Sequence, residues 1–309
     1  MAARLIAARA PRAQLDQLAL LVLTLLCLAW GLNQVAIKLA NAGIPPVFQA
    51  LLRSALSAVL IGLWARARGI ALFPGDRTWR PGVVCGVLFG LEFVALYLGL
   101  DATTAARGVV FFYTMPFFVA LGAAIWLPHE RLTTVQVLGL AGAFTGMAFG
   151  VVDSLGARDA GAFRGDLLCV LAAVLWAATT LVIKTTALVH APAERLLFYQ
   201  LFFSVPVLAA AAPWFGPLAI VAPSPTVLLA LAYQVVVVVT ATYLTWFWLI
   251  RLYPAAQLAS FTFLTPLFGV AAGGLILAEP VTPALLAALA LVAGGIYLVN
   301  RRPAARRRG

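Results

Sequence analysis

The chain has 309 residues, of which 64% are hydrophobic and only 10% charged, and its formal net charge is +11. Soluble domains carry about 25% charged residues, so this composition excludes a water-soluble globular protein and indicates that the chain is surrounded by lipid. The arginines stand in tails and loops beside apolar runs, as in Arg306–Arg308, which favours contact with anionic lipid over binding to nucleic acid.

Ten apolar segments follow one another along the chain, and we expect a transmembrane helix in each because about 20 apolar residues cross ~30 Å of hydrocarbon. They span residues 18–40, 46–64, 81–100, 107–127, 134–152, 166–187, 195–212, 227–250, 256–277 and 283–299. The first segment follows three arginines, as in a signal peptide. It is long enough to span the membrane, so we interpret it as a retained first helix.

The basic residues outside these segments are distributed unevenly between the two sides. With ten spans, 15 of 18 lie in the two tails and in the loops on the same side as the tails. The other three, Arg107, Arg158 and Arg164, lie on the opposite side. The positive-inside rule therefore predicts that both termini are cytoplasmic, in a bacterial cytoplasmic (inner) membrane.

The second half of the sequence resembles the first. Matching positions lie 146 to 150 residues apart: Trp30 with Trp176, Lys38 with Lys184, Pro116 with Pro266, and Glu130 with Glu279. Five helices per half is an odd number, so the second half must insert upside down, as in many secondary transporters. The predicted fold is an all-α membrane protein with ten transmembrane helices in two inverted five-helix repeats, covering residues 1–152 and 153–309.

Two charged residues lie inside apolar segments. A charge at mid-membrane costs ~2.5–3.5 kcal/mol on insertion scales, so it is usually functional or paired. Arg53 and Glu92 lie about seven and eight residues from the same membrane surface, so their depths agree. Glu92 also faces away from a ridge formed by Gly82, Gly86 and Gly90, which we expect to pack on protein. Glu92 is either a substrate or proton site that Arg53 tunes, or half of a structural ion pair.

Aromatic and polar residues share one face near the middle of the first and sixth segments. Trp30 and Asn33 lie on one such face, and Trp176 and Thr180 on the other. Each face is either the wall of a polar cavity or a packing site for a hydrogen-bonded indole.

Other residues fall at the segment ends or interrupt the segments. Lys38 and Lys184 lie at the ends of the first and sixth segments, where they either take part in coupling or extend to the headgroups. Pro116 and Pro266 interrupt the fourth and ninth segments and are either gating points or packing kinks.

Taken together, these positions resemble the ten-helix EamA-type branch of the drug/metabolite transporter superfamily, including its YddG-like amino-acid exporters. The similar residues are Trp30, Asn33, Lys38, Arg53, Tyr199, Gln200 and the Glu-x-Leu/Val-Thr steps at Glu130 and Glu279. The resemblance covers essentially the whole chain. It implies export of small metabolites, often amino acids, through a central cavity between the halves. Tyr97, Tyr113, Tyr243 and Gln257 complete the expected substrate-binding set, because they lie in the segments that would line this cavity.

Signals for other classes of function are weak. The sequence has no H-E-x-x-H motif and no P-loop, and its three cysteines lack metal-binding spacing. We therefore expect no catalysis, no cofactor or metal and no nucleotide, and as partners only a small-molecule substrate and the lipid bilayer, in a monomer or weak dimer. A membrane-embedded enzyme or lipid-handling protein would need a catalytic cluster. A channel or assembly subunit would need a continuous polar stripe. The favoured interpretation is a secondary transporter that works by alternating access.

Overall fold

The structure, a computed structural model, describes residues 15–126, 133–156, 160–253, 258 and 261–300. All regular secondary structure in these residues is helical, which confirms the all-α fold class. Seven helical spans of 22 to 25 residues are long and apolar enough to cross a bilayer, and three shorter apolar helices accompany them. The ten apolar segments of the sequence therefore all appear as helical spans.

The helices follow the predicted segments closely. In the first half they are α1 (Gln17–Asn41), α2 (Pro46–Ala67), α3 (Trp79–Ala102), α4 (Ala105–Phe112), α5 (Met115–Trp126) and α6 (Thr134–Gly156). In the second half they are α7 (Ala160–Thr185), η2 (Ala187–His190), α8 (Ala193–Ala211), η3 (Ala212–Trp214), α9 (Pro225–Ala232), η4 (Tyr233–Thr242), α10 (Tyr243–Leu252), α12 (Leu264–Ile276) and α13 (Pro283–Asn300).

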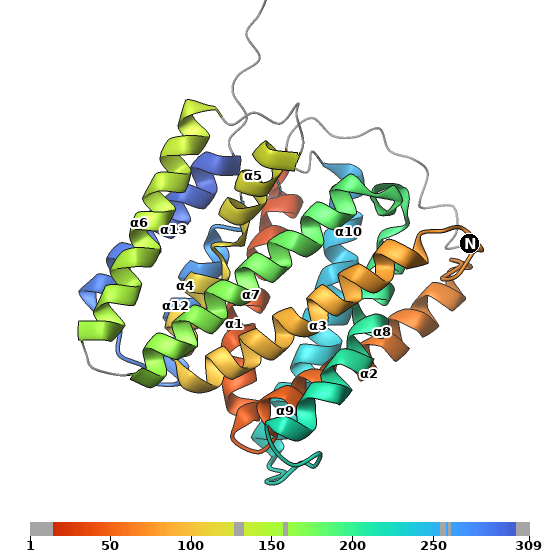
Figure 1. Ribbon diagram of the computed structural model, residues 1–309, viewed down its shortest axis with the longest axis horizontal. Helices are drawn as coiled ribbons and strands as arrows, with labels where there is room; N and C mark the ends of the chain where they lie inside the picture. Colours follow the sequence, from red (N-terminus) through yellow and green to blue (C-terminus); the bar gives the residue numbers. More distant parts are fainter. Residues whose placement is uncertain (1–14, 127–132, 157–159, 254–257, 259–260, 301–309) are drawn as a thin grey trace, which may run out of the picture.

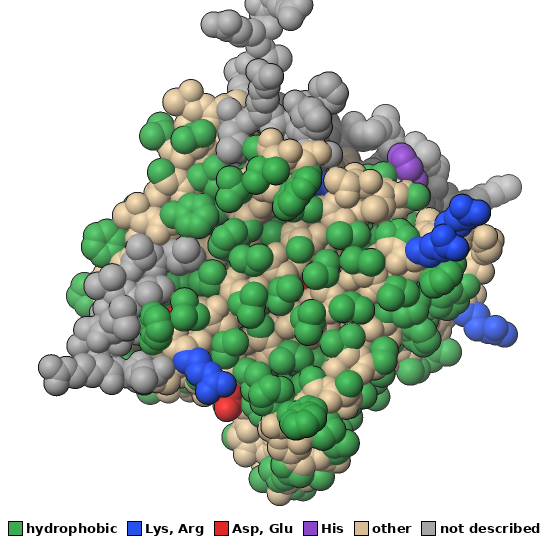
Figure 2. All heavy atoms as spheres, in the orientation of Figure 1, with side chains coloured by type: hydrophobic (Ala, Val, Ile, Leu, Met, Phe, Trp, Pro, Cys, Tyr) green, Lys and Arg blue, Asp and Glu red, His purple; other side chains and the backbone are tan. Residues whose placement is uncertain are grey.

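The helices form one bundle in which neighbouring helices lie side by side (Figure 1). We call the side at which α1 begins, which is upper in Figure 1, the proximal side. The opposite side, where α1 ends and α9 begins, is the distal side. Figure 2 shows that hydrophobic side chains cover most of one face, with the visible Lys and Arg side chains toward its edges. Such a face suits contact with lipid.

The fourth predicted span is broken into α4 and α5 at Tyr113 and Thr114. Pro116 causes the break, because it has no N–H to donate to the carbonyl one turn earlier. At the break, the Thr114 hydroxyl donates to the carbonyl of Phe111 at 2.6 Å.

The ninth and eighth spans also depart from plain α-helix. The regular helix α12 begins only two residues before Pro266, so it is shorter than the expected segment 256–277. The eighth span is continuous, but its middle part, η4, is a π-helix between α9 and α10. Such π segments are often found at functional sites.

The glycine ridge of α3 packs against α8, as the sequence predicts. A methyl group added at any of the three glycines would collide with an α8 residue: Gly82 with Tyr199, Gly86 with Phe203 and Gly90 with Val207. Small residues let the two backbones approach closely. This packing leaves the other faces of α3 free to meet α7 and the bundle interior.

The most extensive helix pairs join the two halves of the chain. They are α6 with α13, α3 with α7, α3 with α8, α1 with α12, and α2 with α8. The halves are therefore interlocked, and residues of the first half face residues of the second across the interior.

Candidate functional site

The interior holds two charged side chains that do not touch each other. Arg53 on α2 and Glu92 on α3 are each 2% exposed. Nε and Nη1 of Arg53 and Oε2 of Glu92 have no hydrogen-bond partner. The two charges nevertheless lie close enough to interact electrostatically. The direct ion pair that the sequence left open is therefore not formed in this structure.

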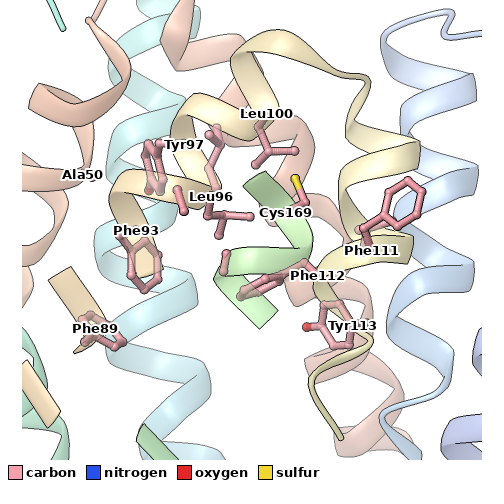
Figure 3. Close-up of a cluster of buried hydrophobic side chains, with 14 of the residues drawn as sticks. Ala50, Phe89, Phe93, Leu96, Tyr97, Leu100, Phe111, Phe112, Tyr113 and Cys169 are labelled. Atoms are coloured by element: carbon pink, nitrogen blue, oxygen red, sulfur yellow. The ribbon is translucent and has the colours of Figure 1, made fainter. Parts of the chain in front are cut away.

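The guanidinium of Arg53 packs against aromatic side chains of α3. Its guanidinium carbon lies 4.1 Å from the centre of the Phe93 ring, a cation–π contact. Phe93 lies between Phe89 and Tyr97, with ring centres 4.5 and 5.8 Å away, and the three rings follow one side of α3 (Figure 3). This contact stabilises the cation but supplies no hydrogen-bond acceptor.

Further buried polar atoms lack hydrogen-bond partners within the part of the chain that the structure describes. They are Oδ1 of Asn33, Oε1 of Gln34, Oε1 of Gln49, Oγ of Ser54 and Ser57, and Nε2 of Gln234. In native proteins about 90% or more of buried polar groups are satisfied, and exceptions often mark bound water or a ligand. We call Gln34, Gln49, Arg53, Glu92, Tyr97 and Gln234 the buried polar cluster.

Helix contacts position several members of the buried polar cluster. Gln49 donates through Nε2 to the carbonyl of Ile37 at 3.4 Å, which fixes α2 beside α1. One turn further into the membrane, Arg53 on α2 and Gln34 on the antiparallel α1 reach the same depth. On the other side, the hydroxyl of Tyr97 donates to Oε1 of Gln234 at 2.6 Å. This bond orients the Gln234 amide and leaves its nitrogen as an unused donor.

The predicted aromatic residues form two groups beside this cluster. Trp30 donates through Nε1 to the Thr242 hydroxyl at 2.8 Å and lies 6.4 Å from the Tyr243 ring. Trp176 stacks on Phe112 at 4.9 Å and meets Tyr113 edge-on at 5.9 Å.

The two groups are linked through their tyrosines. Tyr243 lies close enough to Arg53 and Glu92 to interact with them electrostatically, and it interacts with Tyr113 in the same way. Trp30, Tyr97, Tyr113, Trp176 and Tyr243 therefore lie around one interior region.

Other predicted site residues have more local roles. The Thr180 hydroxyl donates to the carbonyl of Trp176 in its own helix at 3.0 Å. Lys38 donates through Nζ to the carbonyls of Leu100 and Thr103, at 3.0 and 2.5 Å, at the end of α3. These contacts give Lys38 a helix-capping role rather than the snorkelling considered from the sequence.

Lys184 is exposed near the end of α7, away from the interior. Gln257 and Glu130 lie outside the described residues. Pro116 and Pro266 stand at the helix interruptions described above, and a gating role for them stays a prediction.

A buried ion pair on the distal side was missed by the sequence analysis. Nη2 of Arg107 on α4 lies 2.6 Å from Oδ2 of Asp166 on α7, and Asp166 is completely buried. The Thr103 hydroxyl also donates to Asp166 at 2.9 Å. Assigning Arg107 to an exposed loop was therefore wrong. Asp166, at the start of the sixth apolar segment, was the signal available in the sequence, because an acidic residue inside the membrane needs a cationic partner.

Glu279 makes a second distal contact between the halves. Its two carboxylate oxygens accept hydrogen bonds from the backbone N–H groups of Ala105 and Ala106, at 2.8 and 2.9 Å. These N–H groups belong to the first turn of α4, where intrahelical acceptors are lacking and a negative charge is favoured. We call this contact the distal latch. The sequence identified Glu279 as a repeated position but did not predict its partner.

On the proximal side, a loop is tied to the start of α8. Arg195 donates through Nη1 to Asp76 at 3.0 Å and through Nε to the carbonyl of Ala71 at 2.9 Å. The hydroxyl and backbone N–H of Thr78 also donate to Asp76. The hydrogen bonds from Thr78, together with the charge of Arg195, hold the pKa of Asp76 below its usual value.

Comparison with known proteins places this arrangement among transporters. The profile of the EamA-like transporter family matches residues 17–152 and 163–301. An uncharacterized transporter of Bacillus subtilis, YvbV, is 29% identical to the chain over 93% of each. A protein of Escherichia coli named a probable amino-acid metabolite efflux pump is 28% identical over 89% of this chain and 92% of its own length.

A Salmonella typhimurium protein of the same name is 27% identical over 89% of this chain and 92% of its own length. A solved structure described only as that of a protein superposes with a TM-score of 0.64 at 20% identity, over 90% of this chain and 96% of the other. At that identity the superposition concerns the fold alone.

Proposed function

Because the chain belongs to the EamA-like transporter family, we propose that it is a secondary transporter that exports small metabolites, most notably amino acids or related compounds. Transport proceeds by alternating access around the interior region between the two interlocked halves. The observation that carries this proposal is the buried polar cluster, in which several charged and amide atoms lack hydrogen-bond partners among the described residues. Empty of ligand or water, such a cluster would be costly to bury.

The surroundings of the cluster favour an amphiphilic substrate. Trp30, Trp176 and the tyrosines beside them supply apolar and aromatic surface, and the cluster supplies a few polar anchors. Small-molecule sites commonly combine these two features. An amino acid with a sizeable apolar side chain matches this surface better than a sugar or an inorganic ion does. Two relatives named amino-acid metabolite efflux pumps support the same substrate class.

The competing classes gain little support. Within the described part of the chain, no group of three or more His, Cys, Asp or Glu residues is placed to hold a metal ion. Glu92, Asp166 and Glu279 lie in three separate places, the buried polar cluster, the distal ion pair and the distal latch. A secondary transporter remains the function that the geometry favours.

Orientation in the membrane belongs to the same proposal. The proximal side, where α1 begins, faces the cytoplasm in a bacterial inner membrane, because the sequence assigns most basic residues outside the spans to that side. Removing Arg107 from the distal loops makes the charge asymmetry stronger. A reporter that works only in the cytoplasm should be active when fused at Gly309. Activity of a reporter that works only outside the cytoplasm would contradict this orientation.

A counterflow experiment tests the function. Purified protein in liposomes preloaded with one unlabelled solute is exposed to the same solute in labelled form. We expect saturable accumulation for apolar and aromatic amino acids and none in protein-free liposomes. Accumulation of sugar phosphates with no amino acid carried would overturn the substrate class. No accumulation of any solute, by protein that is folded and oriented, would overturn the transporter proposal.

A further inference from the structure

The unpartnered groups of the buried polar cluster include both signs of charge. Resting on the transporter function proposed above, we infer that the cluster is a divided site for a zwitterion: Arg53 and Gln234 bind the carboxylate of the substrate, and Glu92 binds its ammonium group. The substrate class is therefore narrower than small metabolites, because both charged groups must be present on one molecule.

The carboxylate subsite rests on unused donors. Nε and Nη1 of Arg53 have no acceptor, although the side chain is only 2% exposed. The cation–π contact with Phe93 holds the guanidinium in place without using those N–H groups. Nε2 of Gln234 is a third free donor, because Tyr97 occupies only the amide oxygen. Guanidinium and amide donors are the groups that recognise a carboxylate in a buried site.

The ammonium subsite rests on an unused acceptor. Among the described residues, Oε2 of Glu92 has no donor, and its side chain is also 2% exposed. An ammonium group offers three donors and accepts nothing, so it pairs with the carboxylate of Glu92 and not with the guanidinium of Arg53.

When Arg53 and Glu92 are both ionised, a ligand with a single charge leaves one of them uncompensated. Arg53 and Glu92 are close enough to influence each other but do not meet. An anion would neutralise Arg53 and leave Glu92 buried with a negative neighbour, while a cation would do the reverse. A buried charge without compensation is strongly destabilising. A zwitterion satisfies both charges together, and the aromatic groups around Trp30 and Trp176 are then left for its side chain.

The experiment compares four probes that share the phenethyl skeleton. They are L-phenylalanine, L-phenylalaninamide without the carboxylate, 3-phenylpropionate without the ammonium group, and phenethylamine. Counterflow in liposomes and the ligand-induced rise in melting temperature of the purified protein are measured for each. For the wild type we expect L-phenylalanine to exceed every other probe at least ~10-fold, equal to about 1.4 kcal/mol.

The variants Glu92→Gln and Arg53→Gln separate the two subsites. Each should lower L-phenylalanine transport at least ~10-fold. Glu92→Gln should also abolish the preference for L-phenylalanine over 3-phenylpropionate, because the ammonium group no longer gains a partner. Arg53→Gln should instead abolish the preference for L-phenylalanine over L-phenylalaninamide. The matched controls are Asp101→Asn, which removes an exposed acid from α3, and Arg66→Gln, which removes an exposed arginine from α2. Both should keep the wild-type order of probes.

Each outcome bears on the inference. If both variants lose transport equally for all probes, and the double variant regains melting temperature and activity, the two charges form only a structural pair and the inference fails. If the wild type carries amino acids but also their amides or deaminated acids equally well, the divided site is wrong while the transporter proposal stands. If it carries none of the four probes or any other solute, the proposed function itself fails. A variant that does not fold is replaced by Arg53→Lys or Glu92→Asp, which keep the charge and should keep the order of probes.

Discussion

Asp166 is a single acidic side chain that holds two helices and a loop together. It is fully buried at the start of α7, and it accepts hydrogen bonds from Arg107 on α4 and from Thr103 at the end of α3. A buried ion pair of this kind contributes little beyond what an apolar pair of similar volume would contribute. Losing one partner is costly, because the other charge is left uncompensated.

We expect Asp166→Asn to lower the stability of the purified protein by up to about 3–5 kcal/mol, because it removes the carboxylate charge that lies 2.6 Å from the buried Arg107 guanidinium. Thermal unfolding followed by tryptophan fluorescence measures the effect. The double variant Arg107→Met with Asp166→Leu removes both charges and should recover most of the loss. An Asp166→Asn protein that melts like the wild type would show that the pair is not buried as described.

At the level of single residues, the sequence reveals charges and aromatic rings inside long apolar runs. Arg53, Glu92 and Trp30 were identified in this way, because nothing in their neighbourhood explains them as surface residues. Gln234 was missed, because an amide inside an apolar run stands out less than a charge does. Its role depends on the hydrogen bond with Tyr97, which lies 137 positions away in sequence. Arg107 was misassigned because its partner is likewise distant in the chain.

Among the elements, α3 depends most on close packing. The Cβ of a residue replacing Gly86 would collide with the Cβ of Phe203 and come within 3.0 Å of the α8 backbone, which a rotamer change cannot relieve. By contrast, a Cβ added at Gly142 on α6 would meet nothing within 4 Å. The two glycines therefore look alike in sequence and differ in structure.

Gly86→Ala should lower the melting temperature and reduce transport, since α8 must move away from α3. Gly142→Ala is the matched control and should leave both unchanged or raise stability by up to ~1 kcal/mol, because alanine favours the helix. Thermal unfolding of the two variants side by side checks this. Equal melting temperatures for the two variants would contradict the α3–α8 contact.

Element boundaries were predictable where composition changes and less so where the backbone departs from an α-helix. Apolar length located every span, and the two repeated prolines marked the interruptions in the fourth and ninth spans. The π-helical η4 was not foreseen, because its run of valines and threonines has the same hydropathy as an ordinary helix. Its i to i+5 bonding becomes apparent only when the packing partners are known.

At the scale of the whole molecule, the distal latch joins the two halves. Glu279 follows α12 in the second half, and the N–H groups that it accepts from belong to α4 in the first. Alternating access, as proposed above, requires the halves to separate at each side in turn. The latch ties the two halves together on the distal side, and separating them there has to break both hydrogen bonds.

We expect Glu279→Ala to increase distal opening about tenfold or more, because charge-assisted hydrogen bonds contribute about 1.5–3 kcal/mol each. The measurement is labelling of Val109→Cys by a membrane-impermeant maleimide added from the distal side. Cys27, Cys85 and Cys169 are replaced by alanine in this background. Val109 is completely buried beside Gly269 of α12. Asp101→Ala removes a distal acid outside the latch and should leave the labelling rate unchanged. An unchanged rate in Glu279→Ala would show that other contacts keep the distal side closed.

The interlocking of the halves has a consequence for biosynthesis. A chain made from its N-terminus inserts α1 to α6 before α7 to α13 exist, yet the main partners of α1 and α6 are α12 and α13, and those of α3 are α7 and α8. During that interval α8 is not yet present to cover the glycine ridge of α3. Gln234, which belongs to the buried polar cluster with Arg53 and Glu92, has not yet been synthesised. The nascent first half must therefore hold two membrane-embedded charges against lipid or water until the second half arrives, which makes the order of synthesis part of the folding problem for this protein.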